Sequence, residues 1–382
     1  MDETWRLVGG HIWIGTGRET VRGEVSVSDG TIVAAGDTGE GEPIDVSGCT
    51  VIPGLIEAHA HLCFNGESGW RAVYDSDTPG RMLLRMADAG RRMVEAGITT
   101  VRDLGAPTAL ALEARAAFRD GLAKGPDLLV SGAPITTTGG HCHFMGGEAD
   151  GEIELRRAVR ERVKAGCDWI KVMATGGNMT PRTNPLRAQY TVDELRAVVS
   201  EAHRLRRPVA AHCHGTEGIR NAVEAGVDTI EHCSFAGEAG VEQDEETIAR
   251  IAERGIVISP TISAGYRLWP DDGRREQRRA LSRALVRHGC AMVMSTDCGI
   301  PNVPHDALAE GMEVAQELTG LSPGDVLALA TSRAAALLGM DNRGTIEEGK
   351  RADLVVVAGD PAADLSALRR VRMVFRSGKR VV

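Results

Sequence analysis

The chain has 382 residues, of which 42% are hydrophobic and 25% charged, and its formal net charge is −9. A chain of this length can bury a large core without disulfides and still supply a second, smaller domain. The acidic balance, with arginines scattered among aspartates and glutamates, argues against an extended basic surface for nucleic acid or anionic membranes, so small molecules are the expected partners.

The chain begins Met1-Asp2-Glu3-Thr4-Trp5, without the basic start and apolar core of a secretion signal. No apolar run approaches the about 18 residues that a membrane helix needs. The eight cysteines include no C-x-x-C pair, and we expect them to be reduced. These features predict a soluble cytoplasmic protein with no nucleic-acid or membrane partner, and they leave a homo-oligomer open.

Short strands separated by glycine turns are predicted at both ends of the chain. Their expected positions are 5–8, 11–14, 24–27, 31–34, 352–358 and 372–376. Turns such as Asp29-Gly30 separate these runs. We therefore predict that residues 1–50 and 341–382 together form one small β-sandwich domain.

Between these ends, over residues 51–340, short apolar runs alternate with longer helical patterns such as Glu194–Leu205 and Arg278–Arg287. This alternation is typical of parallel β/α units. Strands are expected at 51–58, 99–103, 128–132, 169–174, 208–214, 229–233, 256–261 and 291–297. Eight units predict an α/β fold, a (β/α)8 TIM barrel, in which functional side chains gather at the carboxyl ends of the strands.

Histidines follow several of these expected strands. The candidates are His59-Ala60-His61, His141-Cys142-His143, His212-Cys213-His214 and His232. Because alternate side chains of a strand share a face, the two rings of an H-x-H triplet point the same way. These four places hold seven of the eleven histidines, and Asp297 ends the eighth expected strand. The pattern indicates a metal site.

Lys171 lies inside the apolar fourth strand, where a charged amine without a partner is costly. One interpretation is a buried salt bridge with Asp103, at the end of the second strand. The other is that burial near cations lowers the pKa of the amine, so that the neutral amine takes up carbon dioxide. The resulting carbamate could bridge two divalent ions about 3.5–4 Å apart around a shared hydroxide.

The segment from Val51 to His61, with Lys171, His212, His232 and Asp297, resembles the metal set of the amidohydrolase superfamily. Residues 344–356 resemble its C-terminal signature, so the resemblance spans the whole chain. The segments 99–105, 138–141 and 171–177 resemble the group related to imidazolonepropionase and to prolidase-type, metal-dependent Xaa-Pro dipeptidases.

The resemblance implies two divalent metal ions, with zinc expected, although manganese, cobalt or iron also suit such ligands. The implied ligands are His59, His61 and Asp297 for the buried ion, His212 and His232 for the second, and Lys171 as a bridging carboxylysine. Between His212 and His214, we favour His212 as the ligand.

The resemblance also implies three catalytic residues. Asp297 would take a proton from the bridging hydroxide and deliver it to the leaving nitrogen. His141 resembles a residue that hydrogen-bonds the substrate near its carbonyl, and Tyr190 resembles one that contacts the substrate or intermediate. Contributions from His143, His214 and Asp103 are left open.

We therefore predict a binuclear hydrolase of linear amide-type C–N bonds, with N-acyl amino acids or dipeptides ahead of ureas and carbamates. Arg182 or Arg187 could receive a substrate carboxylate, the alternative being a solvated arginine. The second interpretation is a cyclic amidase or heterocycle deaminase, but such deaminases usually use one metal and lack the bridging lysine. A non-catalytic scaffold should have lost ligands, whereas all six positions are filled here. Phosphotriester hydrolysis as a side activity stays open.

Overall fold

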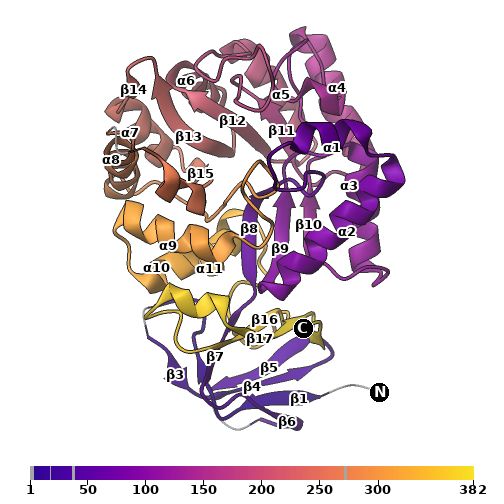
Figure 1. Cartoon of the computed structure of the whole chain (residues 1–382), viewed down its shortest axis with the longest axis vertical. Helices are drawn as coiled ribbons and strands as arrows, with labels where there is room; N and C mark the ends of the chain where they lie inside the picture. The colour runs from indigo at the N-terminus through magenta and orange to yellow at the C-terminus, as the bar shows by residue number, and fades with distance from the viewer. Residues whose placement is uncertain (1–3, 18, 37–38, 271–272) are drawn as a thin grey trace.

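Parallel strands surrounded by helices form the larger part of the molecule (Figure 1). The computed structural model describes residues 4–17, 19–36, 39–270 and 273–382. Met1–Glu3 belong to the segment from which we predicted that a secretion signal is absent, and they lie outside the described residues. The parallel strands are β8 (Leu55–Ala60), β9 (Ile98–Asp103), β10 (Asp127–Val130), β11 (Ile170–Met173), β12 (Val209–Gly215), β13 (Thr229–Gly237) and β15 (Val257–Ser259). They pair in the orders β10-β9-β8 and β11-β12-β13-β15.

Single parallel bridges connect these two sheets on both sides. Ile135, just after β10, pairs with Val172 of β11. On the other side, residues 292–298 lie between β15 and β8, through the bridges Ile258 to Met292 and Ala60 to Cys298. The backbone pairing thus runs from β8 through the other parallel strands and back to β8.

The expected strand at 291–297 is not a regular strand, and this part of the prediction is wrong. The segment makes only isolated bridges, because its hydrogen bonds go to different neighbours. The Met294 amide donates to the Leu329 carbonyl at 2.8 Å, and the Asp297 amide donates to the His59 carbonyl at 3.0 Å. Asp297 also has a φ of 63°, which lies outside the extended region.

The apolar run expected as one strand at 51–58 is two strands with different partners. Residues Cys49–Pro53 form β7, which pairs antiparallel with β16 (Leu354–Ala358), and β8 begins at Leu55. Gly54 lies between them, where an added Cβ would lie 2.1 Å from Thr99 Oγ1. Periodicity could not reveal this change, because both strands are buried and equally apolar.

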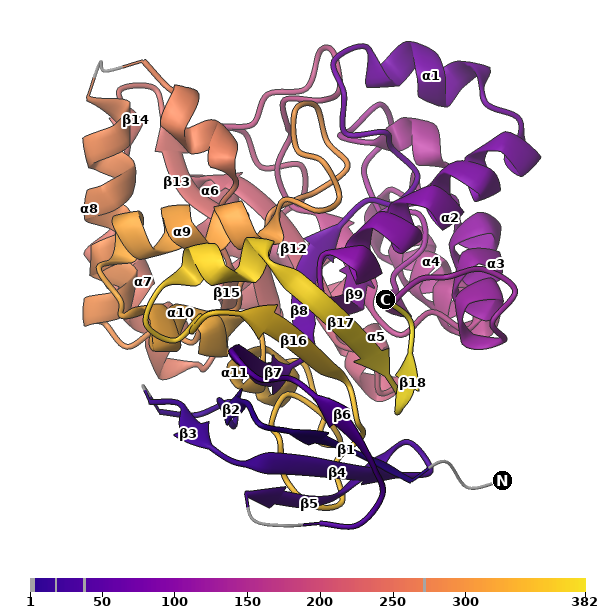
Figure 2. The ribbon, with the colours of Figure 1, turned by 60° about the horizontal axis from the view of Figure 1, so that its bottom comes forward.

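The two chain ends share a pair of sheets (Figure 2). The first has the order β5-β4-β1-β6, and the second has the order β18-β17-β16-β7-β2-β3. Their bounds are β1 (Trp5–Val8), β2 (His11–Ile12), β3 (Val21–Arg22), β4 (Glu24–Ser28), β5 (Thr31–Gly36), β6 (Glu42–Asp45), β17 (Val371–Arg376) and β18 (Lys379–Arg380). Side chains of both sheets form one buried cluster, in which the rings of Trp5 and Phe375 stack at 4.4 Å.

Helices cover the outside of the parallel strands (Figure 1). They are α1 (Trp70–Ser76), α2 (Pro79–Glu95), α3 (Thr108–Arg119), α4 (Gly151–Ala165), α5 (Val192–Arg204), α6 (Thr216–Ala225), α7 (Glu245–Glu253), α8 (Arg274–Arg287), α9 (Leu308–Thr319), α10 (Pro323–Leu329) and α11 (Ser332–Leu337). Short 3-10 helices are η1 (His143–Met145), η2 (Ala264–Leu268) and η3 (Leu365–Arg369), and β14 (Gly240–Val241) pairs antiparallel with the end of β13. None of the described helices has both the length and the apolar character to cross a membrane.

Candidate metal centre

His59 and His61, at the end of β8, direct their Nε2 atoms to the same carboxylate oxygen. Asp297 Oδ1 lies 3.4 Å from His59 Nε2 and 3.2 Å from His61 Nε2. The opposite nitrogen of each ring has its own partner: His59 Nδ1 bonds Glu231 Oε2 at 2.8 Å, and His61 Nδ1 bonds the Gly105 carbonyl at 2.9 Å. With Nδ1 as the donor, each Nε2 presents a lone pair toward Asp297, the arrangement that metal-binding histidines have.

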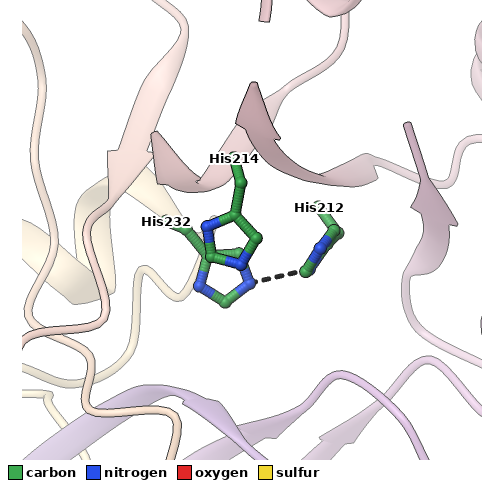
Figure 3. Close-up of side chains that lie close together, drawn as sticks. All are labelled: His212, His214 and His232. Atoms are coloured by element: carbon green, nitrogen blue, oxygen red, sulfur yellow. Dashed lines mark hydrogen bonds between the residues drawn. The ribbon is translucent and has the colours of Figure 1, made fainter. Parts of the chain in front are cut away.

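Three histidines of β12 and β13 form a second group (Figure 3). His212 Nδ1 lies 2.8 Å from His232 Nε2. The far nitrogen of each ring, the one not in the contact between His212 and His232, also has a partner. His212 Nε2 contacts the Gly176 carbonyl at 3.1 Å, and His232 Nδ1 contacts Thr261 Oγ1 at 2.8 Å. Burial lowers the pKa of both rings well below the ordinary range, so both are neutral and able to bind a metal.

His214 stacks against His232 with a ring separation of 4.4 Å (Figure 3). Its Nδ1 bonds Ser234 Oγ at 3.0 Å. The half-buried ring is within reach of the same ion position as His212 and His232. The three rings therefore come together, and proximity alone does not separate His212 from His214.

Lys171 lies beside the first histidine group. Its Nζ is 3.4 Å from His59 Nε2, its side chain is buried in β11, and this burial lowers the pKa of the amine. The ion pairs of the described residues include none between Lys171 and Asp103. The Asp103 carboxylate instead accepts the backbone amides of Leu62 and Gly105, both at 3.1 Å. A salt bridge between Lys171 and Asp103 is therefore not found among the described residues; the nearby carboxylates that act on the Lys171 amine are those of Glu231 and Asp297.

Asp297 completes the first group and also faces the second. Burial raises the pKa of its carboxyl group, but His59, His61 and Lys171 outweigh that effect and hold the pKa below its ordinary value. Its Oδ2 lies 4.0 Å from His232 Nδ1. Its Oδ1 is buried and has no hydrogen-bond partner among the described residues. A buried carboxylate oxygen that faces the Nε2 atoms of two histidines fits a divalent cation.

A model of the amidohydrolase family matches residues 50–381. The chain belongs to this family. It is therefore a hydrolase of amide-type carbon–nitrogen bonds, and the fold neighbours of the family imply a TIM barrel with a small second domain.

Individual relatives of this amidohydrolase include members of the groups that the sequence motifs predicted. Ochratoxinase of Aspergillus niger is 30% identical over 368 residues, covering 86% of this chain and 75% of the relative. An imidazolonepropionase of Anaeromyxobacter sp. (strain K) is 28% identical over 367 residues, covering 86% and 80%. The crystal structure of a Xaa-Pro dipeptidase with bound methionine has a TM-score of 0.88 and 27% identity, covering 99% of each chain. The predicted subgroup of the superfamily is thus confirmed.

The two remaining candidate histidines, His141 and His143, have different surroundings in this amidohydrolase. The His141 ring lies 4.6 Å from that of His212, and its buried Nδ1 has no partner among the described residues. Burial lowers the pKa of His141 to about 3, so the ring is neutral. His143 lies in η1, half-buried beside Phe144. Of these two histidines, only His141 packs directly against the second histidine group.

Tyr190 and the two loop arginines are not joined to the metal centre by any contact of the described residues. The buried Tyr190 hydroxyl donates to the Ala149 carbonyl at 2.8 Å. Arg182 and Arg187 are exposed, and neither side chain forms an ion pair within the described residues. A substrate contact by any of the three remains a prediction.

Glu57 connects β8 to the segment that carries Asp297, a role that the sequence analysis missed. Its carboxylate accepts the Thr296 hydroxyl at 2.6 Å and the backbone amides of Thr296 and His59, each at 3.0 Å. Burial raises the pKa of this carboxyl group to about 7. A charged residue inside the apolar run before His59 was the available signal.

Glu231 and Arg102 were also missed. Glu231 directly precedes His232, and Arg102 directly precedes Asp103, each inside an expected apolar strand. Both side chains are completely buried and form an ion pair of 2.9 Å. The signal was the same as for Lys171, because a charged residue in an apolar strand needs a buried partner.

Proposed function

We propose that the protein is a two-metal hydrolase of linear amide bonds, with N-acyl amino acids and dipeptides as its substrate class. The observation that carries this proposal is the buried Asp297 carboxylate, which groups with His59 and His61 and lies 4.0 Å from His232 of the second group. The names of two relatives, ochratoxinase and Xaa-Pro dipeptidase, support amide substrates with an amino-acid part.

We assign the buried ion to His59, His61 and Asp297, and the second ion to His212 and His232. Burial lowers the pKa of Lys171, which favours the neutral amine that would take up carbon dioxide, with loss of a proton, to form a carbamate ligand for both ions. Zinc suits imidazole and carboxylate ligands best. Two such ions would supply a hydroxide nucleophile at neutral pH and polarise the scissile carbonyl.

The protein groups then carry the proton. Asp297 stays ionised because His59, His61 and Lys171 lower its pKa, so it can accept the proton of the attacking nucleophile. The same carboxyl group would donate that proton to the leaving nitrogen. His141, beside His212, has an unpartnered ring nitrogen with which to hydrogen-bond the substrate near its carbonyl. Tyr190, whose hydroxyl donates to the Ala149 carbonyl, would contact the substrate as a hydrogen-bond acceptor.

We also propose the domain boundaries, the cellular location and the partners of the protein. We assign residues 51–340 to a (β/α)8 barrel, supported by the backbone pairing that returns to β8, and residues 1–50 with 341–382 to a β-sandwich domain. A cytoplasmic location is supported by eight cysteines that all lack a disulfide partner. Small molecules are the proposed partners, as a monomer or homo-oligomer.

A cyclic amidase is the second candidate, and the similarity to an imidazolonepropionase favours it. Metal analysis and a substrate panel separate the candidates. The panel comprises N-acetyl amino acids, Xaa-Pro dipeptides, aryl ureas, lactams and aminopurines. We expect two ions per chain and the highest kcat/KM on an N-acyl amino acid or dipeptide. Full activity with one ion per chain, or faster ammonia release from an aminopurine, would contradict the proposal.

A further inference from the structure

A fully buried ion pair lies beneath the first histidine group. Arg102 Nη2 of β9 donates to Glu231 Oε1 of β13 at 2.9 Å, and neither side chain has any exposed surface. Removing two charges from water is costly, and an apolar pair of similar volume is often equally stable. Stability alone therefore gives little reason for this pair.

Each nitrogen of the Arg102 guanidinium and each oxygen of the Glu231 carboxylate has a hydrogen-bond partner, which fixes the orientation of the glutamate. Arg102 also donates to the Ala58 carbonyl at 2.7 Å and to Thr229 Oγ1 at 3.1 Å, and its guanidinium lies 4.4 Å from the Trp169 ring centre. Thr229 Oγ1 in turn donates to Glu231 Oε1 at 2.5 Å. Oε1 therefore accepts two hydrogen bonds, and Oε2 is left for a third donor.

That third donor is His59 Nδ1, at 2.8 Å from Glu231 Oε2. A carboxylate can only accept, so the hydrogen of His59 must be on Nδ1 and the Nε2 lone pair faces Asp297. His61, in the same group, bonds a neutral carbonyl through its Nδ1 instead. Only one of the two histidines is therefore held by an ionised group.

We propose that Glu231 and Arg102 are positioning residues that fix the tautomer and orientation of His59 and thereby set the affinity of the buried metal site. This inference rests on the proposed metal centre. Partners of this kind change metal affinity by about 10- to 100-fold when they are removed. The effect falls on the site of His59, His61 and Asp297 and spares the site of His212 and His232, whose far nitrogens contact Gly176 and Thr261.

Glu231→Gln tests the proposal. The glutamine has one acceptor oxygen for three donors, and its amide NH2 would face either His59 or Arg102. We expect one of the two metal dissociation constants, measured by chelator competition, to rise by about 10- to 100-fold. The visible spectrum of the Co²⁺-substituted protein should change for that site only. Arg102→Lys, which keeps the charge, should weaken the metal less than Arg102→Met.

Glu201→Gln is the matched control. Glu201 of α5 is also buried and paired with arginines, Arg160 and Arg204, but it lies on the helical layer. Its loss should lower Tm without changing either metal dissociation constant or the Co²⁺ spectrum.

Wild-type affinity and spectrum in Glu231→Gln would overturn the proposal. If that variant does not fold, Thr229→Val provides the test, because it removes one hydrogen bond to Glu231. We expect the affinity of the buried metal site to fall several-fold in this variant, and an unchanged affinity would refute the inference. A wild-type protein that binds no metal would instead refute the proposed function.

Discussion

At the scale of single residues, the centre depends on which nitrogen or oxygen of each side chain is already engaged. His59, His61, His212 and His232 each have one ring nitrogen held by a protein acceptor or hydroxyl, so the other nitrogen faces the centre. Asp297 has one oxygen without any hydrogen-bond partner among the described residues. Residue types alone suggest a metal site, whereas these contacts define its geometry.

Asp297→Asn should reduce kcat by about 10²- to 10⁴-fold, the range for loss of a general acid–base group. The amide cannot accept the proton, and its weaker ligand oxygen should also lower the occupancy of the buried ion. Steady-state kinetics and metal analysis of the same sample measure both effects. Asp306→Asn is the control, because this exposed carboxylate follows in the same loop and contacts Arg92. Equal activity in the two variants would exclude Asp297 from catalysis.

Glu201 gives a prediction about pH. Hydrogen bonds from Arg204 and Arg160 lower the pKa of Glu201 to about 2 from its ordinary value of 4.5. Because the folded-state pKa is the lower one, the stabilisation is complete above about pH 5 and is lost as the pH falls from 4.5 toward 2. Glu201→Gln should therefore reduce the free energy of unfolding by about 1 kcal/mol at pH 7. Urea titrations should show this difference shrinking from pH 5 to pH 3.5, and a constant difference would contradict the assignment.

The sequence predicted those site residues whose type alone is informative. His59, His61 and Lys171 stand out because imidazoles and a lysine are unusual in apolar strands. It did not reach Glu231, because the bond to His59 joins residues 172 positions apart and depends on strand register. Tyr190 was predicted to contact the substrate, but its hydroxyl donates to the Ala149 carbonyl, a contact that the sequence pattern does not indicate.

At the scale of elements, the joint between β7 and β8 carries the chain from the terminal sheets to the parallel strands. Both strands are continuous apolar runs, so the sequence predicted one strand where the structure has two. Gly54 makes this joint possible, because its amide bonds the Asp353 carbonyl at 2.8 Å while its α carbon packs against Thr99. The position of β8, and with it His59, depends on that close approach.

Gly54→Ala should destabilise the fold by about 1–3 kcal/mol, the usual cost of overpacking a core. The added Cβ would lie 2.1 Å from Thr99 Oγ1 and 2.9 Å from Thr99 Cβ, so a rotation of Thr99 cannot fully relieve the clash. Denaturant titration measures the loss. Gly80→Ala is the control, because nothing lies within 4 Å of its Cβ position in helix α2, and it should be neutral or slightly stabilising. Equal effects would show that Gly54 has no special role.

At the scale of the whole molecule, the metal centre connects strands from distant parts of the chain. The residues of the first group come from β8, β11 and the segment before Cys298, and those of the second come from β12 and β13. Ions held by both groups would therefore cross-link β8, β11, β12, β13 and the segment before Cys298. Such ligands bind the folded state and not the dispersed chain, so their binding energy adds to the stability of the fold.

Removal of the metals should consequently lower the Tm at which the parallel-strand part of the molecule unfolds. At a free zinc concentration of 100 times the dissociation constant, one site stabilises the folded state by about 2.7 kcal/mol, and Tm should rise with zinc concentration. Chelation followed by thermal scans measures this shift. In Glu231→Gln the zinc-dependent rise in Tm should shift to higher zinc concentrations, and the loss of the buried ion pair with Arg102 should also lower the Tm measured without zinc. A Tm that does not respond to chelation or added zinc would mean that the two histidine groups do not hold structural cross-links, whatever the enzyme's activity.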